Sequence, residues 1–181
     1  ATDLDDTLLN SHHEVTERTA NALKRAMDAG VMVSLSSGRM NEAMTPFAKR
    51  LGVNAPMILF NGELIYDHRE DRTLFSNTIP AETARQVAKM LEDMGVYVQI
   101  YPGKGYYCNR KCEHTYAYEK QIGVIATELG MPVSEWMQGD MVKMLAISDP
   151  ETNTRVQAQL QEAFPKGVHF MKSKAHFLEI V

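Results

Sequence analysis

The sequence has little of what marks a secreted, membrane-spanning or disulfide-stabilised protein. Its 181 residues include two cysteines, Cys108 and Cys112, which are too few for a disulfide framework and favour a reducing compartment. No apolar run approaches the ~20 residues of a transmembrane helix, and uninterrupted runs such as Met57–Phe60 are short. The first residues do not follow the basic, apolar and small-residue order of a secretion signal. We therefore expect a cytoplasmic protein that does not span a membrane.

The chain also has no excess of basic residues. Lysine and arginine number 19 against 23 aspartates and glutamates, so the formal net charge is −4. Nucleic-acid-binding domains carry a basic patch or stripe, and we expect no nucleic-acid partner. Charged residues make up 23% and hydrophobic residues 44% of the chain, which is the composition of a folded globular protein rather than of a disordered chain.

The first 60 residues alternate between buried strands and amphipathic helices. A strand tail at Ala1–Thr2 is followed by a helix over about 16–29, where Thr16 is the expected N-cap. Residues 31–35 and 57–60 have the apolar runs of buried strands, and a helix over about 41–51 separates them. Strands separated by helices indicate βαβ units and a parallel sheet.

The pattern changes after this segment. Residues 63–67 and 73–76 flank a charged turn and predict a hairpin. The remainder predicts an α+β arrangement, with a domain boundary near Asn77. We therefore expect an α/β protein with a Rossmann-like parallel-sheet core in residues 1–77 and an α+β domain in residues 78–181. Strands are predicted at 96–101, 106–109, 142–148, 168–172 and 175–181, and helices at 80–95, 113–121 and 149–164.

Three carboxylates, Asp3, Asp5 and Asp6, stand immediately after the first strand. On extended backbone Asp3 and Asp5 point to the same side, and like charges at close range favour a bound cation or a shared proton. In an open parallel sheet, ligands bind beyond the carboxyl ends of the strands. The turn Ser36–Arg39 leaves the next strand at this edge and offers a hydroxyl and backbone N–H groups for an anion. A cation site, an anion site and a free carboxylate together indicate phosphoryl chemistry.

A purely structural interpretation is that the acidic run is a loop with capping carboxylates. Three features together favour the functional interpretation. These are the strand-end position of the carboxylates, the turn Ser37–Arg39 one βαβ unit later, and Asn61–Gly62 after the third strand.

These segments resemble known motifs. Asp3–Leu9 resembles the DxDGTLL motif of the haloacid dehalogenase-like hydrolases, with Asp6 in place of the usual glycine. Ser37–Arg39 resembles the T-G-R motif of their Cof-type branch, the large-cap, type IIB sugar-phosphate phosphatases. Asn61–Asp67 is similar to the N-G-A-x-I-Y-D segment of that branch. The α+β part from about Thr78 is similar to its inserted cap domain.

The resemblance implies a reaction and roles for individual residues. Asp3 would be the nucleophile that forms an aspartyl-phosphate, and Asp5 would protonate the leaving alcohol and deprotonate the hydrolytic water. Mg²⁺ would bind the Asp3 carboxylate and the Asp5 backbone carbonyl. The expected substrate is a small phosphorylated metabolite, in particular a sugar phosphate.

The same resemblance assigns the phosphate contacts. Ser37 would donate a hydrogen bond to the phosphoryl group, assisted by the backbone N–H groups of Gly38 and Asp6. Asn61 and Gly62 would line the site. Arg39 would brace the turn through a salt bridge.

Two further family motifs, a lysine and a G-D-x-x-N-D segment that completes the metal site, are not present before Val181. We therefore expect the sequence to be part of a longer chain, with an incomplete core that is inactive by itself. Two alternatives stay open: a phosphomutase, and a non-catalytic phosphate-binding or regulatory module of the same fold. The oligomeric state is not predicted.

Overall fold

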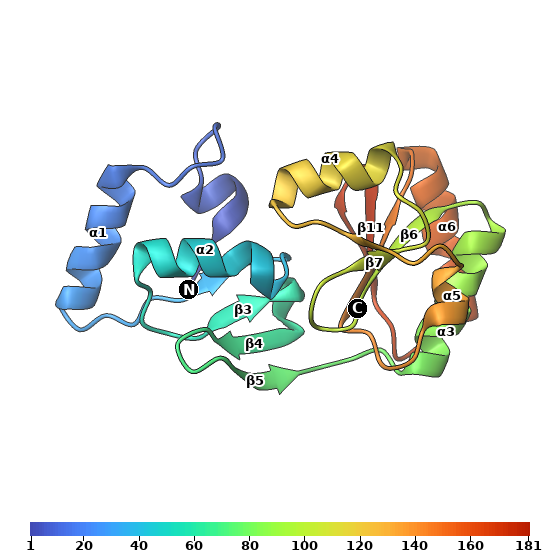
Figure 1. Ribbon diagram of the computed structural model, residues 1–181, viewed down its shortest axis with the longest axis horizontal. Coiled ribbons are helices and arrows are strands. Elements are labelled where there is room, and N and C mark those ends of the chain that lie inside the picture. The colour runs from blue at the N-terminus through green and yellow to red at the C-terminus, as the bar shows by residue number, and fades with distance from the viewer. The chain divides into compact units, whose positions relative to one another are not determined.

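A computed structural model describes all 181 residues, which divide into two compact units, Ala1–Ser76 and Asn77–Val181 (Figure 1). The division lies where the sequence pattern changes from alternating strands and helices to hairpins. No helix in either unit has the length and apolar content needed to cross a membrane.

The first unit is built on a mixed five-stranded sheet. The three strands nearest the N-terminus are parallel, and the last two add to them as an antiparallel hairpin. The parallel part confirms the predicted α/β, Rossmann-like class. The strand order is β1 (Thr2–Asp3), β2 (Leu35–Ser36), β3 (Met57–Leu59), β4 (Leu64–Asp67) and β5 (Arg72–Ser76).

Two helices connect the parallel strands at the predicted positions. Helix α1, Glu17–Asp28, is capped by Thr16, whose hydroxyl accepts a hydrogen bond from the Thr19 N–H at 3.2 Å. Helix α2, Asn41–Leu51, is capped at its C-terminus by Gly52, which has the left-handed conformation with φ +61°. Six residues separate α1 from β2, and five separate α2 from β3.

The strand predicted over residues 31–35 is shorter than expected. Only Leu35–Ser36 forms strand β2. The reason is that the Asn54 side chain holds the preceding residues: its Oδ1 accepts from the Val33 N–H at 2.7 Å, and its Nδ2 donates to the Val31 carbonyl at 3.1 Å. The carbonyls of Val33 and Ser34 still accept hydrogen bonds from the Ala55 N–H at 3.2 Å and the Thr2 N–H at 3.0 Å. Val31 and Met32 are exposed, so the first part of the run is not buried as predicted.

The second unit is an α+β unit with its own hydrophobic core. Strands β6, β9 and β11 form the centre of a six-stranded sheet, and Figure 1 shows α3, α5 and α6 gathered on one side of it. The sheet order is β10 (Phe170–Lys174), β11 (Phe177–Ile180), β9 (Lys143–Ile147), β6 (Tyr97–Tyr101), β7 (Tyr107–Cys108) and β8 (Thr127–Glu128), and the helices are α3 (Ala81–Asp93), α4 (Glu113–Ile122), α5 (Val133–Trp136) and α6 (Pro150–Ala163).

Two elements of this unit are absent from the sequence-based prediction. Strand β8 has two residues and helix α5 has four. Elements of this length complete no full repeat of the hydrophobic pattern, so periodicity cannot reveal them. The other predicted strands and helices of the unit are present, with ends shifted by a few residues.

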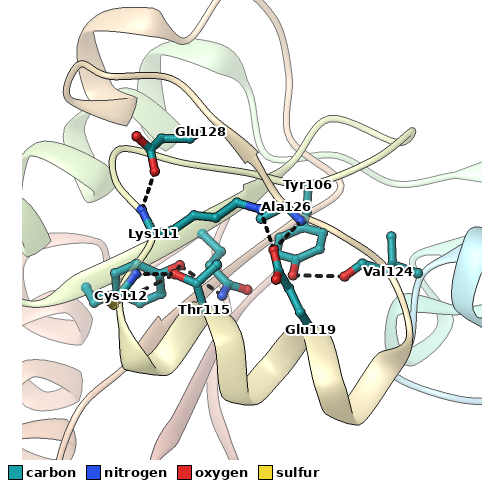
Figure 2. A network of polar contacts seen from close by, with 10 residues as sticks. Tyr106, Lys111, Cys112, Thr115, Glu119, Val124, Ala126 and Glu128 are labelled. Atoms are coloured by element: carbon teal, nitrogen blue, oxygen red, sulfur yellow. Dashed lines mark hydrogen bonds and ion pairs between the residues drawn. The ribbon is translucent and has the colours of Figure 1, made fainter.

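A polar network connects α4 to the segments that precede and follow it in the chain (Figure 2). The Glu119 carboxylate accepts hydrogen bonds from the Lys111 ammonium at 2.7 Å and from the Ala126 N–H at 2.9 Å. The hydrogen bond from Lys111 holds the pKa of Glu119 below its usual value. The Lys111 N–H donates in turn to Glu128 in β8 at 2.8 Å. These bonds position the chain on both sides of α4.

We predict that residues 77–181 fold when expressed alone, because their hydrophobic cluster is built entirely from this unit. A cooperative urea transition followed by circular dichroism is the expected result. Leu91→Ala, at a fully buried position, should then cost about 2–5 kcal/mol, whereas Met131→Ala, at an exposed one, should change stability by about 0.5 kcal/mol or less. A broad, non-cooperative transition would contradict the prediction.

Candidate active site

The carboxyl ends of the three parallel strands lie at one edge of the first unit's sheet. Asp3 of β1 is paired in register with Ser36 of β2, and Ser36 is paired with Ile58 of β3. The chain therefore leaves all three strands at the same level. Asp3 is the last residue of β1, and every other candidate residue predicted from the sequence follows one of these strand ends within a few positions.

The first segment is a single tight turn, η1 (Leu4–Leu8). The Leu9 N–H donates to the Leu4 carbonyl at 3.0 Å, and both leucines are buried. Asp3, immediately before the turn, is exposed, and its Oδ1 accepts a hydrogen bond from the Leu4 N–H at 2.8 Å. The buried leucines therefore anchor the turn, while the Asp3 carboxylate is held at the strand end and is open to solvent.

Asp6 has a left-handed backbone conformation, with φ +57°. Glycine adopts this conformation without steric cost, which accounts for the glycine in the DxDGTLL motif that this segment resembles. Aspartate is one of the few other residues that enter it readily. The departure from the motif at Asp6 is thus compatible with the turn.

Arg39 forms a bidentate ion pair with Asp5. Its Nε donates to Asp5 Oδ2 at 2.9 Å and its Nη2 to Asp5 Oδ1 at 2.7 Å. The Arg39 side chain is 9% exposed, and that of Asp5 is 34% exposed. The predicted salt bridge of Arg39 is confirmed, and its partner is the carboxylate for which an acid–base role was predicted.

Backbone hydrogen bonds connect the second segment to the third. The Ser37 N–H donates to the Ile58 carbonyl at 2.9 Å, the Phe60 N–H to the Arg39 carbonyl at 3.2 Å, and the Asn61 N–H to the Ser37 carbonyl at 3.3 Å. Within the second segment, the Arg39 N–H donates to Ser37 Oγ at 3.2 Å. Ser37 and Arg39 are both buried, so the turn after β2 is fixed from both sides.

The third segment has an unusual backbone. Phe60, Asn61 and Gly62 all have positive φ, at +50°, +62° and +105°. A buried phenylalanine in this region is a rare conformation, which persists only where the surroundings impose it. Such strain is frequent at functional sites. The sequence contains a signal for Asn61 and Gly62 but none for Phe60.

Gly38 and Asn61 approach each other closely. A Cβ atom on Gly38 would lie 2.6 Å from Asn61 Oδ1, which is closer than any two such atoms can come. Glycine at position 38 is therefore required for the Asn61 side chain to occupy its place. The predicted residues Ser37, Gly38 and Asn61 are thus brought into one cluster.

The oxygen atoms of the first segment are of the kind that Mg²⁺ prefers, a carboxylate from Asp3 and a backbone carbonyl from Asp5. Mg²⁺ keeps several of its waters and takes one or two carboxylates from the protein, so these groups fit it. They do not make a full protein-supplied site, because no three side chains of histidine, cysteine, aspartate or glutamate are grouped to hold a metal ion. The Asp5 carboxylate is engaged by Arg39.

Comparison with known families identifies the chain. The family model of the haloacid dehalogenase-like hydrolases matches residues 1–181. The chain belongs to this family. The predicted membership of this family is therefore confirmed.

Several curated proteins are similar to the chain. Phosphatase YwpJ of Bacillus subtilis is 35% identical over 59% of the chain and 37% of its own length. Pyridoxal phosphate phosphatase YbhA of Escherichia coli is 32% identical over 56% of the chain and 37% of its own length. HMP-PP phosphatase of Shigella boydii is 25% identical over the whole chain and 68% of its own length. The first two relatives are thus matched over little more than a third of their length.

Solved structures share the fold. A haloacid dehalogenase-like hydrolase from Bacteroides thetaiotaomicron superposes with a TM-score of 0.89 at 21% identity, over 99% of this chain and 68% of that one. A sugar phosphatase of haloacid dehalogenase subclass IIB superposes with a TM-score of 0.80 at 17% identity, over 98% and 67%. The chain therefore shares its fold with a structure of the predicted type IIB branch.

We predict that Gly38→Ala destabilises the protein, because the new methyl group displaces the Asn61 side chain. The expected cost is about 1–3 kcal/mol in urea unfolding of the complete protein. In an Asn61→Gly background most of this cost should disappear, since the clashing atom is gone and glycine accepts the positive φ at position 61. Gly139→Ala is the matched control, because a Cβ there meets no atom within 4 Å. Equal costs at Gly38 and Gly139 would refute the prediction.

Proposed function

We propose that the protein is a Mg²⁺-dependent phosphatase that hydrolyses small phosphorylated metabolites, in particular sugar phosphates, through an aspartyl-phosphate on Asp3. The observation that carries the proposal is the exposed Asp3 carboxylate at the end of β1, in register with the strand that leads to Ser37. The proposal is supported by relatives named as phosphatases of pyridoxal phosphate and HMP-PP.

Asp3 supplies the nucleophile in this mechanism. One of its carboxylate oxygens forms a bond to phosphorus while the bond from phosphorus to the leaving oxygen breaks. A carboxylate needs no separate base to activate it, in contrast to a serine hydroxyl. The Leu4 N–H donates a hydrogen bond of 2.8 Å to Asp3 Oδ1, which fixes the orientation of the carboxylate. The side chain therefore loses less conformational freedom when the transition state forms.

Asp5 handles the protons in both halves of the reaction. In the first half a proton passes from Asp5 to the leaving alkoxide oxygen, which departs as an alcohol. In the second half water attacks phosphorus, the bond to Asp3 breaks, and Asp5 takes the proton from that water. Inorganic phosphate is then released, the Asp3 carboxylate is free again and Asp5 carries its proton again.

In the proposed complex the phosphoryl group is bound by residues from all three loops, namely Asp6, Ser37, Gly38, Asn61 and Gly62. Ser37 Oγ accepts from the Arg39 N–H, so its own hydrogen is available to donate to a phosphoryl oxygen. Backbone N–H groups at the turns add further donors for the charge that develops on the oxygens.

Asp3 and the Asp5 carbonyl would hold Mg²⁺. When bound, the ion offsets the repulsion between the anionic nucleophile and the anionic phosphate. The chain's own contribution is to keep these two oxygen donors at the end of β1, where Leu4 and Leu9 anchor the turn in the core.

We further propose that the second unit is the cap domain of the type IIB branch, with the division at residues 77–78. A cap restricts a site to small substrates by closing over it. We also propose a cytoplasmic location, in which the free thiols of Cys108 and Cys112 stay reduced.

The complete protein should release phosphate from p-nitrophenyl phosphate or a sugar phosphate in the presence of Mg²⁺. EDTA should abolish the activity and added Mg²⁺ should restore it. Asp3→Asn should lower kcat by about 10³-fold or more, because the amide is a poor nucleophile. Asp28→Asn, at an exposed position on α1, is the control and should retain wild-type kcat. Turnover by the Asp3 variant at the control's rate would disprove the aspartyl-phosphate mechanism.

A further inference from the structure

We propose that Arg39 is the positioning residue for Asp5, and that it acts on the reaction only through that carboxylate. The inference rests on the proposed function and adds a role that the phosphate-binding and metal-binding assignments leave open. Both oxygens of Asp5 are held by one guanidinium group, at 2.7 and 2.9 Å. A planar fork with two parallel hydrogen bonds fixes a carboxylate in orientation as well as in place.

Arg39 is itself held from several sides. Its guanidinium lies over the Phe47 ring of α2, at 5.8 Å from the ring centroid. Its N–H donates to Ser37 Oγ and its carbonyl accepts from the Phe60 N–H. Since the side chain is 9% exposed, it has little room to move. The position of Asp5 is thereby set by the segments that follow β2 and β3, and by α2.

The ion pair still leaves Asp5 able to act. A carboxylate has about four lone-pair directions, and the fork of Arg39 uses one on each oxygen. The other direction on each oxygen can meet the leaving group or the hydrolytic water. Asp5 is 34% exposed, so it is accessible to both. Without the fork the side chain would rotate about its two χ angles and would be aligned only part of the time, and misalignment of a proton donor is costly in rate.

The chain contains a matched pair without a role in the candidate site. Arg69 holds Asp67 in the same geometry, with Nε on Oδ1 at 3.0 Å and Nη2 on Oδ2 at 2.9 Å. This pair belongs to the turn that joins β4 and β5 in the first unit. Substitutions of Arg69 therefore report the cost of losing a bidentate pair when no catalytic carboxylate is involved.

The test uses the complete protein with Mg²⁺, and phenyl phosphate and p-nitrophenyl phosphate as substrates. Phenolate is the poorer leaving group and depends more on the proton from Asp5 than p-nitrophenolate does. Arg39→Lys keeps the charge but cannot bridge both oxygens. It should lower kcat for phenyl phosphate by about 10–100-fold, with KM changed by about twofold or less. The initial burst of p-nitrophenolate should slow by only about threefold or less.

A double-mutant cycle separates positioning from direct action. In an Asp5→Asn background, Arg39→Lys should cause no further loss in the burst rate, because its partner is already inactive. Arg69→Lys should leave kcat for both substrates at the wild-type value. Thermal unfolding of each variant, compared with that of Arg69→Lys, reports any change in folding.

The outcomes distinguish the two proposals. An inactive wild-type protein rejects the proposed function and this inference with it. With an active wild type, a raised KM or a loss that persists in the Asp5→Asn background shows that Arg39 binds the phosphate directly and overturns the inference alone. Equal losses in the kcat for phenyl phosphate and in the rate of the p-nitrophenolate burst, or equal losses for Arg39→Lys and Arg69→Lys, also overturn it. The inference stands if the kcat for phenyl phosphate falls more than the burst rate for p-nitrophenyl phosphate and if the loss in burst rate vanishes without Asp5.

Discussion

The close approach of three parallel strand ends is the constraint on which the candidate site depends. The paired register of β1, β2 and β3 brings Asp3, Ser36 and Ile58 to one level, but register alone does not fix the loops that follow. The ion pair of Arg39 with Asp5 joins the first loop to the second, and backbone hydrogen bonds from Phe60 and Asn61 join the third to the second. Each of these connections restricts the position of one loop relative to another.

These loops need backbone conformations that most residues avoid. Asp6 and Asn61 have positive φ, and both are residue types whose short polar side chains tolerate it. Phe60 is not of this type, yet it is fully buried, so packing against the core supplies the free energy that offsets its strain. The conformation of the segment after β3 therefore depends on the stability of the core beneath it.

The fold could be predicted from the sequence where local signals are strong. Helix α2 is found with both of its predicted ends, because its apolar spacing and Gly52 agree on them. The strand over residues 31–35 could not be predicted correctly, since its pairing depends on Asn54, which is distant in sequence and carries no periodic signal. Strand β8 and helix α5 could not be predicted, because two and four residues are too few to show a hydrophobic period.

For the candidate site, the residue types could be chosen from the sequence, but their contacts could not. A salt bridge of Arg39 was predicted, while its partner Asp5 lies 34 residues away and became evident only in three dimensions. The same holds for the contact of Gly38 with Asn61, which depends on side-chain placement across two strands. Contacts between loops that are distant in sequence leave no pattern in a single sequence, because they do not depend on which residues stand next to the contacting ones along the chain.

The two units divide the proposed work in a way that their construction favours. Every candidate residue for phosphoryl chemistry lies before Leu64, whereas the second unit has a hydrophobic cluster made only from its own residues. Residues on the surface of the second unit can therefore be substituted without disturbing the register of β1, β2 and β3 or the ion pair of Asp5. Function resides in sites that are carried on folds, and one fold can host many specificities. An arrangement of this kind allows one set of chemical groups to serve relatives that act on different phosphorylated compounds, since the chemistry and the choice of substrate can vary independently.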